Sequence, residues 1–187
     1  MNPTPYPFED FLRAKQRLYR ALFEHHEPFV LLTGETGTGK TALLRELRAE
    51  LDRTRYRVVY FAQARKLGAV GLVKVIAEGL RVRPSLCHAL ALERVLRALA
   101  EEPRTLLLWL DEAHDLPEET LAEARAITES DLAGAGPIQV LLVGLPKLRA
   151  QLQAQPALWR RIGVRAEITG LRFEELNACL LYTSDAA

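Results

Sequence analysis

Short apolar runs alternate along the chain with longer segments of mixed polarity. Five runs consist almost entirely of apolar residues, and the first of them, PFVLLT, begins at Pro28 and ends before a glycine. Runs of this length and character are typical of strands that are buried on both faces of a sheet. We therefore predict strands at residues 28–33, 56–62, 104–112, 138–144 and 164–170.

The segments between these runs place apolar residues three and four positions apart, which is the period of an amphipathic helix. Residues 117–130 show the clearest start signal, because Pro117 stands first and acidic side chains fill the first turn. The other expected helices are 8–25, 40–51, 69–80, 86–100, 146–153 and 156–162. Buried strands that alternate with helices predict an α/β fold, in which a parallel sheet of about five strands is sandwiched by helices.

Composition indicates one globular domain without a strong net charge. The chain has 187 residues, of which 49% are hydrophobic and 26% charged, and its formal net charge is +1. So small a net charge creates no overall field that attracts nucleic acid, so any DNA contact must be local. Cys87 and Cys179 show no metal-binding spacing, which indicates reduced thiols and a cytoplasmic protein. No apolar run approaches the roughly 18 residues that a membrane segment needs.

The segment GETGTGKT, residues 34–41, carries the clearest chemical signal. It matches the phosphate-binding pattern GxxxxGK(S/T) and lies between a predicted strand and a predicted helix. Its backbone N–H groups would surround phosphate oxygens, while Lys40 reaches the β- and γ-phosphates and Thr41 offers its hydroxyl to Mg²⁺. A glycine-rich turn without a ligand is the alternative, but the flanking elements favour nucleotide binding. The residues expected to bind nucleotide are Gly34, Glu35, Thr36, Gly37, Thr38, Gly39, Lys40 and Thr41.

A second signal is the run LLLWLDEAHD, in which an apolar strand ends in two acids. Asp111 falls at the carboxyl end of the strand, where open α/β sheets bind ligands, and would hold Mg²⁺ through water. Glu112 follows it and is expected to orient or deprotonate an attacking water. For His114 a capping or surface role is favoured over a chemical one, since no metal-ligand partner lies at useful spacing.

Arginines form two further groups of interest. Arg160 and Arg161 end a predicted helix, where an arginine could project onto the γ-phosphate of a neighbouring subunit, with a solvated basic patch as the alternative. Arg165 is expected to be an exposed strand residue. Candidates for contact with DNA phosphates, with an ordinary solvated surface as the alternative, are Arg45, Arg48, Arg53, Arg55, Arg57, Arg65 and Lys66.

Four segments resemble, in this order, the AAA+ ATPases of the ORC1/DEAH group: LLTGETGTGKTALL, LLLWLDEAHDL, VLLVGLPKLRAQL and RRIGVRAEITGL. That group includes the ExeA-type secretion ATPases and the TniB, TnsC and MuB-like regulators of transposition. The resemblance implies an ATP-dependent homo-oligomer, with residues 34–41 as the Walker A motif and Asp111 and Glu112 as the Walker B pair. It also implies that Arg161 (or Arg160) is an arginine finger that acts in trans.

The resemblance runs from about residue 6 to residue 176 and divides the chain. Residues 1–176 are expected to form the AAA+ nucleotide-binding domain, and residues 1–7 an extended arm because of their prolines. Residues 171–176 would begin a small helical lid domain that is otherwise missing. The tail CLLYTSDAA resembles a peptide read from a sequencing adapter, so residues 177–187 are expected to be non-native and the protein to be truncated.

One position departs from the AAA+ pattern. Many AAA+ proteins carry a polar sensor residue at the end of the fourth strand, but here that strand ends in LLVGLP, and Gln139 lies too early to replace it. This departure puts the coupling of hydrolysis to movement in doubt. GETGTGKT and DEAH also resemble motifs I and II of the DEAH-box helicases, but the next strand leads to GLPKL instead of their Ser-Ala-Thr motif, and we expect no second RecA-like domain.

The leading hypothesis is ATP binding and hydrolysis, dependent on Mg²⁺, by a DNA-associated regulator of transposition or a related mobile-element process. Its expected partners are further copies of the chain, duplex DNA and a recombinase or transposase. The alternatives are an ExeA-type secretion ATPase and an ATP-dependent assembly switch with little turnover. Glu112 and the arginine pair favour hydrolysis, whereas the missing sensor residue favours the switch.

Overall fold

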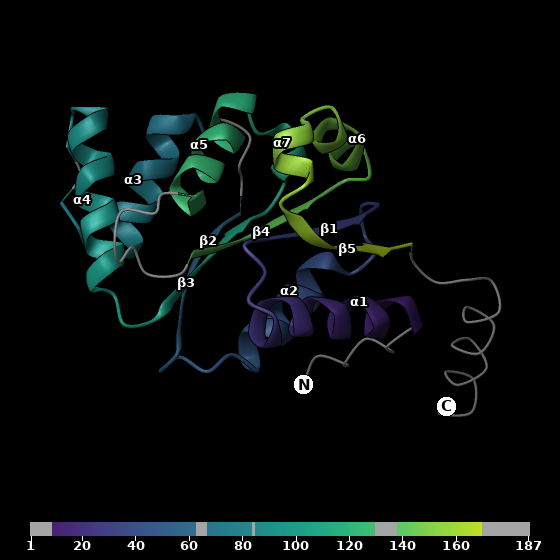
Figure 1. Cartoon of the computed structure of the whole chain (residues 1–187). Helices are drawn as coiled ribbons and strands as arrows, with labels where there is room; N and C mark the ends of the chain where they lie inside the picture. Colours follow the sequence, from purple (N-terminus) through teal and green to yellow (C-terminus); the bar gives the residue numbers. More distant parts are fainter. Residues whose placement is uncertain (1–8, 63–66, 84, 130–137, 170–187) are drawn as a thin grey trace.

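A sheet of five parallel strands in the order β2-β3-β4-β1-β5 forms the centre of the molecule (Figure 1). The computed structural model describes residues 9–62, 67–83, 85–129 and 138–169. The strands are β1 Phe29–Gly34, β2 Tyr56–Phe61, β3 Thr105–Leu110, β4 Ile138–Gly144 and β5 Ile162–Ile168. The predicted α/β fold with a parallel five-stranded sheet is confirmed.

The place of each strand in the sheet explains its polarity. The central strands β1, β3 and β4 are buried along nearly their whole length, because they have strands on both edges and helices on both faces. The edge strand β5 instead alternates buried residues such as Ala166 with exposed ones. Arg165 is one of the exposed residues of β5, as expected.

Helices form a layer on each face of the sheet (Figure 1). One layer consists of α1 Glu9–Tyr19, the π-helical turn η1 Arg20–Glu24 and α2 Lys40–Ala49. Their apolar side chains share one buried cluster with Leu107 and Trp109 of β3. On the other face, a second cluster joins the sheet to the remaining helices, and α4 packs against the outer side of α3. These helices are α3 Ala69–Gly79, α4 His88–Glu101, α5 Glu118–Glu129, α6 Lys147–Gln153 and α7 Pro156–Trp159.

Several predicted boundaries are wrong by two residues or more, and three of them have a clear cause in the backbone. The first α-helix ends at Tyr19 and continues as the π-helical turn, in which the His25 N–H donates to the Arg20 carbonyl (2.9 Å). α7 ends at Trp159 because residues 160–161 form a turn. β5 begins at Ile162 instead of at residue 164, because Ile162 pairs with the first residue of β1. Hydrophobic periodicity reports none of these backbone details.

Several predictions fall outside the described residues. These are the arm at 1–7, the lid start at 171–176, the non-native tail at 177–187, and the basic residues Arg65 and Lys66. Within the part of the chain that is described, no helix has the length and apolar character needed to cross a membrane.

Because all strands run in one direction, their carboxyl ends meet at one edge of the sheet. β4 is hydrogen-bonded to β1 on one side and to β3 on the other. The loop after β1 and the residues after β3 are therefore separated by only two strand spacings, roughly 10 Å. This edge places residues 34–41 beside the acidic pair that follows β3.

Gly79 allows α3 to lie close against β2, and its substitution tests this packing. A Cβ at Gly79 would overlap the Cγ2 of Val59, a stiff β-branched side chain. We expect Gly79→Ala to lower the free energy of unfolding by about 1–3 kcal/mol, measured by urea denaturation. Gly71→Ala in the first turn of α3 is the control, because its Cβ would meet only the tip of Leu67 and helix propensity would improve. Equal effects of the two substitutions would contradict this account.

Candidate nucleotide-binding site

The loop after β1 curls back because its glycines adopt conformations that other residues avoid. Gly37 and Gly39 have φ angles of 84° and 96°, in the left-handed region. A Cβ on Gly34 would lie only 2.5 Å from the carbonyl oxygen of Ile168 and 2.7 Å from Thr38 Oγ1. α2 begins directly after the loop, so the N–H groups of its first turn are available to a ligand. This is the backbone shape that phosphate binding needs.

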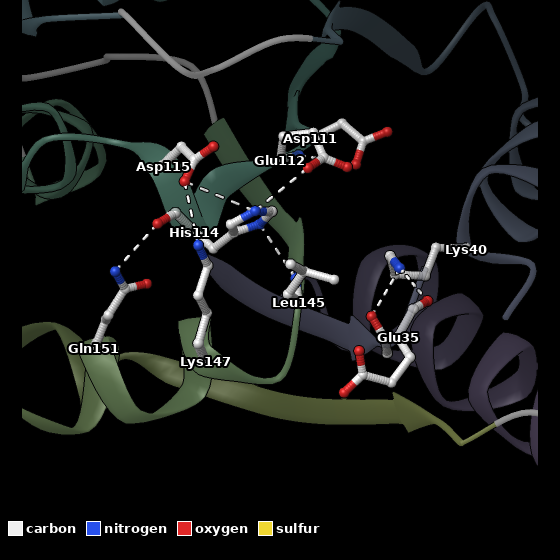
Figure 2. A network of polar contacts seen from close by, with 10 residues as sticks. Glu35, Lys40, Asp111, Glu112, His114, Asp115, Leu145, Lys147 and Gln151 are labelled. Carbon is white, nitrogen blue, oxygen red and sulfur yellow. Dashed lines mark hydrogen bonds and ion pairs between the residues drawn. The ribbon is translucent and has the colours of Figure 1, made fainter. Parts of the chain in front are cut away.

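Lys40 lies inside this loop instead of in solvent. Its Nζ donates hydrogen bonds to the carbonyl oxygens of Gly34 and Glu35, both at 2.7 Å (Figure 2). Burial lowers the pKa of Lys40, and the nearby charges of Glu112 and Asp111 oppose that shift. The ammonium is thus held at the centre of the loop by carbonyl groups that phosphate oxygens could replace.

Asp111 is buried at the carboxyl end of β3, as predicted. Its N–H donates to the Phe61 carbonyl of β2 (2.9 Å), and its carboxylate accepts from the Tyr60 hydroxyl (3.0 Å). Burial and the bond to Asp111 raise the pKa of Tyr60 to about 12, so this phenol remains a donor at neutral pH. Sequence reasoning missed Tyr60. Its place near Asp111 follows from the sheet, in which Tyr60 pairs with Trp109.

Glu112 occupies an unusual backbone conformation between β3 and the 3₁₀ turn Ala113–Asp115. Its φ is 55°, which is rare for a residue with a side chain and is found at functional sites. Its side chain is 49% exposed, and Oε2 lies 3.4 Å from Nε2 of His114. The expected base is therefore accessible to water.

His114 is buried, so of the predicted capping or surface role the surface alternative is wrong. Its Nδ1 accepts a hydrogen bond from the N–H of Leu145 (3.2 Å), just after β4. Its carbonyl accepts from Nε2 of Gln151 in α6 (3.1 Å), and its neighbour Asp115 contacts Lys147 of the same helix (3.3 Å). Figure 2 shows these contacts beside Glu112. The DEAH turn is thereby attached to the end of β4 and to α6.

A cavity of about 160 Å³ beside α2 is lined by two hydroxyl groups, two arginines and two apolar side chains, which belong to Thr41, Tyr60, Arg45, Arg48, Leu44 and Trp109. Thr41 and Tyr60 line this cavity, and the Tyr60 hydroxyl reaches Asp111. Mg²⁺ prefers one or two protein oxygens together with phosphate oxygens and water. The described residues contain no group of three or more His, Cys, Asp or Glu that could hold a metal alone. Thr41 and Asp111 carry oxygen atoms of this kind, so they are the described residues that would hold Mg²⁺ together with a bound nucleotide.

Arg160 and Arg161 lie at the opposite edge of the sheet. Both are exposed, and they precede Ile162, which pairs with Phe29 at the start of β1. The phosphate-binding loop follows the far end of β1, roughly 20 Å away at 3.3 Å per residue. Arg161 contacts Glu129 of α5 (3.1 Å). Neither arginine is brought to the site of its own chain.

Gln139 is also distant from the site, because it donates to the carbonyl of Glu27, before β1 (3.1 Å).

Several of the residues predicted to contact DNA lie together near the end of α2 and the start of β2. We call the arginines around a hollow of about 250 Å³ the arginine patch: Arg48, Arg53, Arg57 and Arg104. Glu102 contacts Arg57 and Arg104, each at 2.8 Å, and hydrogen bonding from Arg104 lowers the pKa of Glu102. Arg104 was not among the expected residues, because the pairing of β2 with β3 brings it there. Arg45 lines the neighbouring cavity with Thr41.

Comparison with known proteins finds similarity to a secretion pathway protein and to solved structures of Cdc6 and ORC1 proteins. The General secretion pathway protein A of Aeromonas hydrophila is 30% identical over 168 residues, covering 85% of this chain and 30% of that protein. Cdc6p from Pyrobaculum aerophilum is 25% identical, with a TM-score of 0.79 over 99% of this chain and 52% of that chain. The Aeropyrum pernix ORC1 protein in complex with DNA, at 21% identity, shares the fold with a TM-score of 0.70, over 98% of this chain and 51% of that one.

The chain spans about half the length of these solved relatives, and less than a third of the secretion protein. A family model described as an AAA domain matches residues 23–152. That match includes both the loop after β1 and the acidic pair after β3. The AAA+ resemblance drawn from the motifs is therefore confirmed, and the chain belongs to the AAA domain family.

Proposed function

We propose that this protein binds ATP with Mg²⁺ and hydrolyses it. The observation that supports this most strongly is the position of Lys40. Its buried ammonium interacts electrostatically with the carboxylates of Glu112 and Asp111 at the carboxyl edge of the sheet. A nucleotide with its phosphates in the loop at 34–41 would place its γ-phosphate between this lysine and the acidic pair. Glycine-loop N–H groups, one cation and two carboxylates are the parts that P-loop hydrolases use.

In the proposed reaction, Glu112 acts on a water molecule beside the γ-phosphate. The water oxygen bonds to the γ-phosphorus, the bond from that phosphorus to the β–γ bridging oxygen breaks, and Glu112 accepts the proton of the water. Lys40 and the N–H groups of the loop stabilise the negative charge on the phosphate oxygens. Thr41 and Asp111 would hold Mg²⁺, which neutralises further phosphate charge.

The proposed active form is a homo-oligomer. Arg160 and Arg161 lie about one strand length from the loop of their own chain, so they can serve only the site of another copy. Both are exposed, and in the described part of the chain Arg161 contacts Glu129. We assign the arginine finger to Arg161, with Arg160 as the alternative.

We also infer that duplex DNA is a partner, consistent with a regulator of transposition or a related mobile-element process. The arginine patch supports this, because Glu102 neutralises only part of its charge and clustered cations bind backbone phosphates. The A. pernix ORC1 relative was solved with DNA.

The similarity to a secretion protein supports a secretion-linked ATPase as the second candidate. The expected location is the cytoplasm, where thiols such as the free, exposed Cys87 remain reduced.

Replacement of the proposed base tests hydrolysis. We expect Glu112→Gln to lower kcat for Mg²⁺-dependent ATP hydrolysis by about 100-fold or more, since a general base contributes about 10²–10⁴-fold. Binding of a fluorescent ATP analogue should persist in this variant and be lost in Lys40→Ala. The assay is steady-state phosphate release, with and without duplex DNA. ATP binding by the wild-type protein without turnover in either condition would favour the assembly switch and reject hydrolysis.

Mixing of two inactive variants tests the arginine finger. Lys40→Ala removes the site but keeps the arginine, and Arg161→Ala removes the arginine but keeps the site. Each alone should lose turnover, and an equal mixture should recover part of it, because some interfaces combine an intact site with an intact arginine. Arg160→Ala in place of Arg161→Ala is the matched control. Wild-type turnover by Arg161→Ala alone would rule out this assignment, and loss of turnover in Arg160→Ala with recovery in its own mixture would move the finger to Arg160.

The salt dependence of DNA binding tests the arginine patch. If Arg53 contacts a phosphate, Arg53→Ala should weaken binding of a labelled duplex and reduce the slope of log K against log salt by about 1. Arg97→Ala is the control, because Arg97 lies on α4 and pairs with Glu93. Fluorescence anisotropy over a range of salt concentrations provides the measurement. Identical slopes for the two variants would argue against this surface and leave the secretion-linked candidate.

A further inference from the structure

The ring of His114 lies between the end of β4 and the proposed catalytic carboxylate. On one side, the N–H of Leu145 donates to Nδ1 (3.2 Å). On the other side, Nε2 lies 3.4 Å from Oε2 of Glu112 and 3.8 Å from Oδ1 of Asp115 (Figure 2). His114 therefore touches both the residue that follows the strand and the proposed base.

The contact with Leu145 determines how the ring carries its proton. A nitrogen that accepts a hydrogen bond has no proton of its own, so a neutral ring must carry its proton on Nε2. That N–H faces the carboxylate of Glu112. The distance of 3.4 Å is slightly longer than a usual N–H···O bond, and a small rotation of the half-exposed Glu112 side chain would close it.

The sequence of β4 is adapted to this ring. A Cβ on Gly144 would lie 3.0 Å from Nδ1 of His114 and from Cδ2 of Leu148, and 3.3 Å from the backbone nitrogen of His114. Any side chain at this position would press on the imidazole. The end of β4 therefore lacks a polar side chain of its own, and the polar group found there comes from the DEAH turn.

We propose that His114 is a positioning residue for ATP hydrolysis, whose Nε2–H orients the Glu112 carboxylate while Nδ1 is anchored to the Leu145 N–H. This inference rests on the proposed hydrolysis. The end of β4 has no polar side chain of its own. In this proposal, His114 supplies the polar group at that position. Glu112 needs such support, because its left-handed backbone and exposed side chain do not by themselves hold one orientation.

A purely structural role of His114 is the competing explanation. Substitution by Asn and by Gln distinguishes that role from the proposed positioning role. In His114→Asn the amide reaches the position of Nδ1, so it can keep the anchor to Leu145 but not the contact with Glu112. In His114→Gln the amide extends to the position of Nε2 and can donate to Glu112. A structural anchor predicts that Asn replaces His at least as well as Gln.

Steady-state kinetics of the full chain test the proposal. We expect His114→Asn to lower kcat by about 10-fold or more, because misplacement of a catalytic group is costly. His114→Gln should recover several-fold of that loss, and KM for ATP should change little in either variant. Equal kcat values for the two variants, or a higher value for Asn, would overturn the positioning role. Thermal unfolding of both variants identifies any loss that follows from stability alone.

A second measurement does not depend on turnover and separates this inference from the proposed function. In ¹⁵N-labelled protein, the imidazole resonances of His114 should show a neutral ring protonated at Nε2, and Glu112→Gln should shift the Nε2 signal. A ring protonated at Nδ1 would overturn the inference even if the enzyme hydrolyses ATP. If wild-type protein binds ATP but does not turn it over, the proposed function fails, whatever the state of the ring.

Discussion

Hydrogen bonding of β4 to β1 on one side and to β3 on the other is the constraint on which the candidate site depends. These three buried strands determine how far the loop at 34–41 lies from the acids after β3. Because these strands are apolar and covered on both faces, their backbone groups are hydrogen-bonded along the sheet, and the register is tightly specified. Small displacements of β4 would therefore change the separation of Lys40 from Glu112.

Polar groups at this edge of the sheet are held by one another and by the backbone. Lys40 donates to two loop carbonyls, Asp111 accepts from Tyr60, and His114 accepts from Leu145. Buried polar groups need such partners, because an unpaired one costs roughly 1–3 kcal/mol. The arrangement is thus ordered in advance, which limits the reorganisation that a bound phosphate chain would require.

Opposite edges of the sheet have different roles in the proposed oligomer. The carboxyl edge carries the loop and the acidic pair, whereas Arg160 and Arg161 stand at the amino edge of β5. α6 contacts the DEAH turn through Gln151 and packs against α7, which ends directly before the two arginines. One short pair of helices therefore connects the base of one site with the arginine proposed for the next.

The sequence by itself determined the α/β class and the order of the elements, and it predicted Lys40, Thr41, Asp111 and Glu112 as site residues, because apolar periodicity and the glycine-rich loop are local signals. Only the tertiary structure revealed Tyr60 at Asp111, Arg104 in the arginine patch and the buried ring of His114 against the end of β4. Those contacts join residues that lie far apart in the chain, as the Tyr60–Asp111 bond does. They follow from strand order and register, which no local pattern of residues encodes.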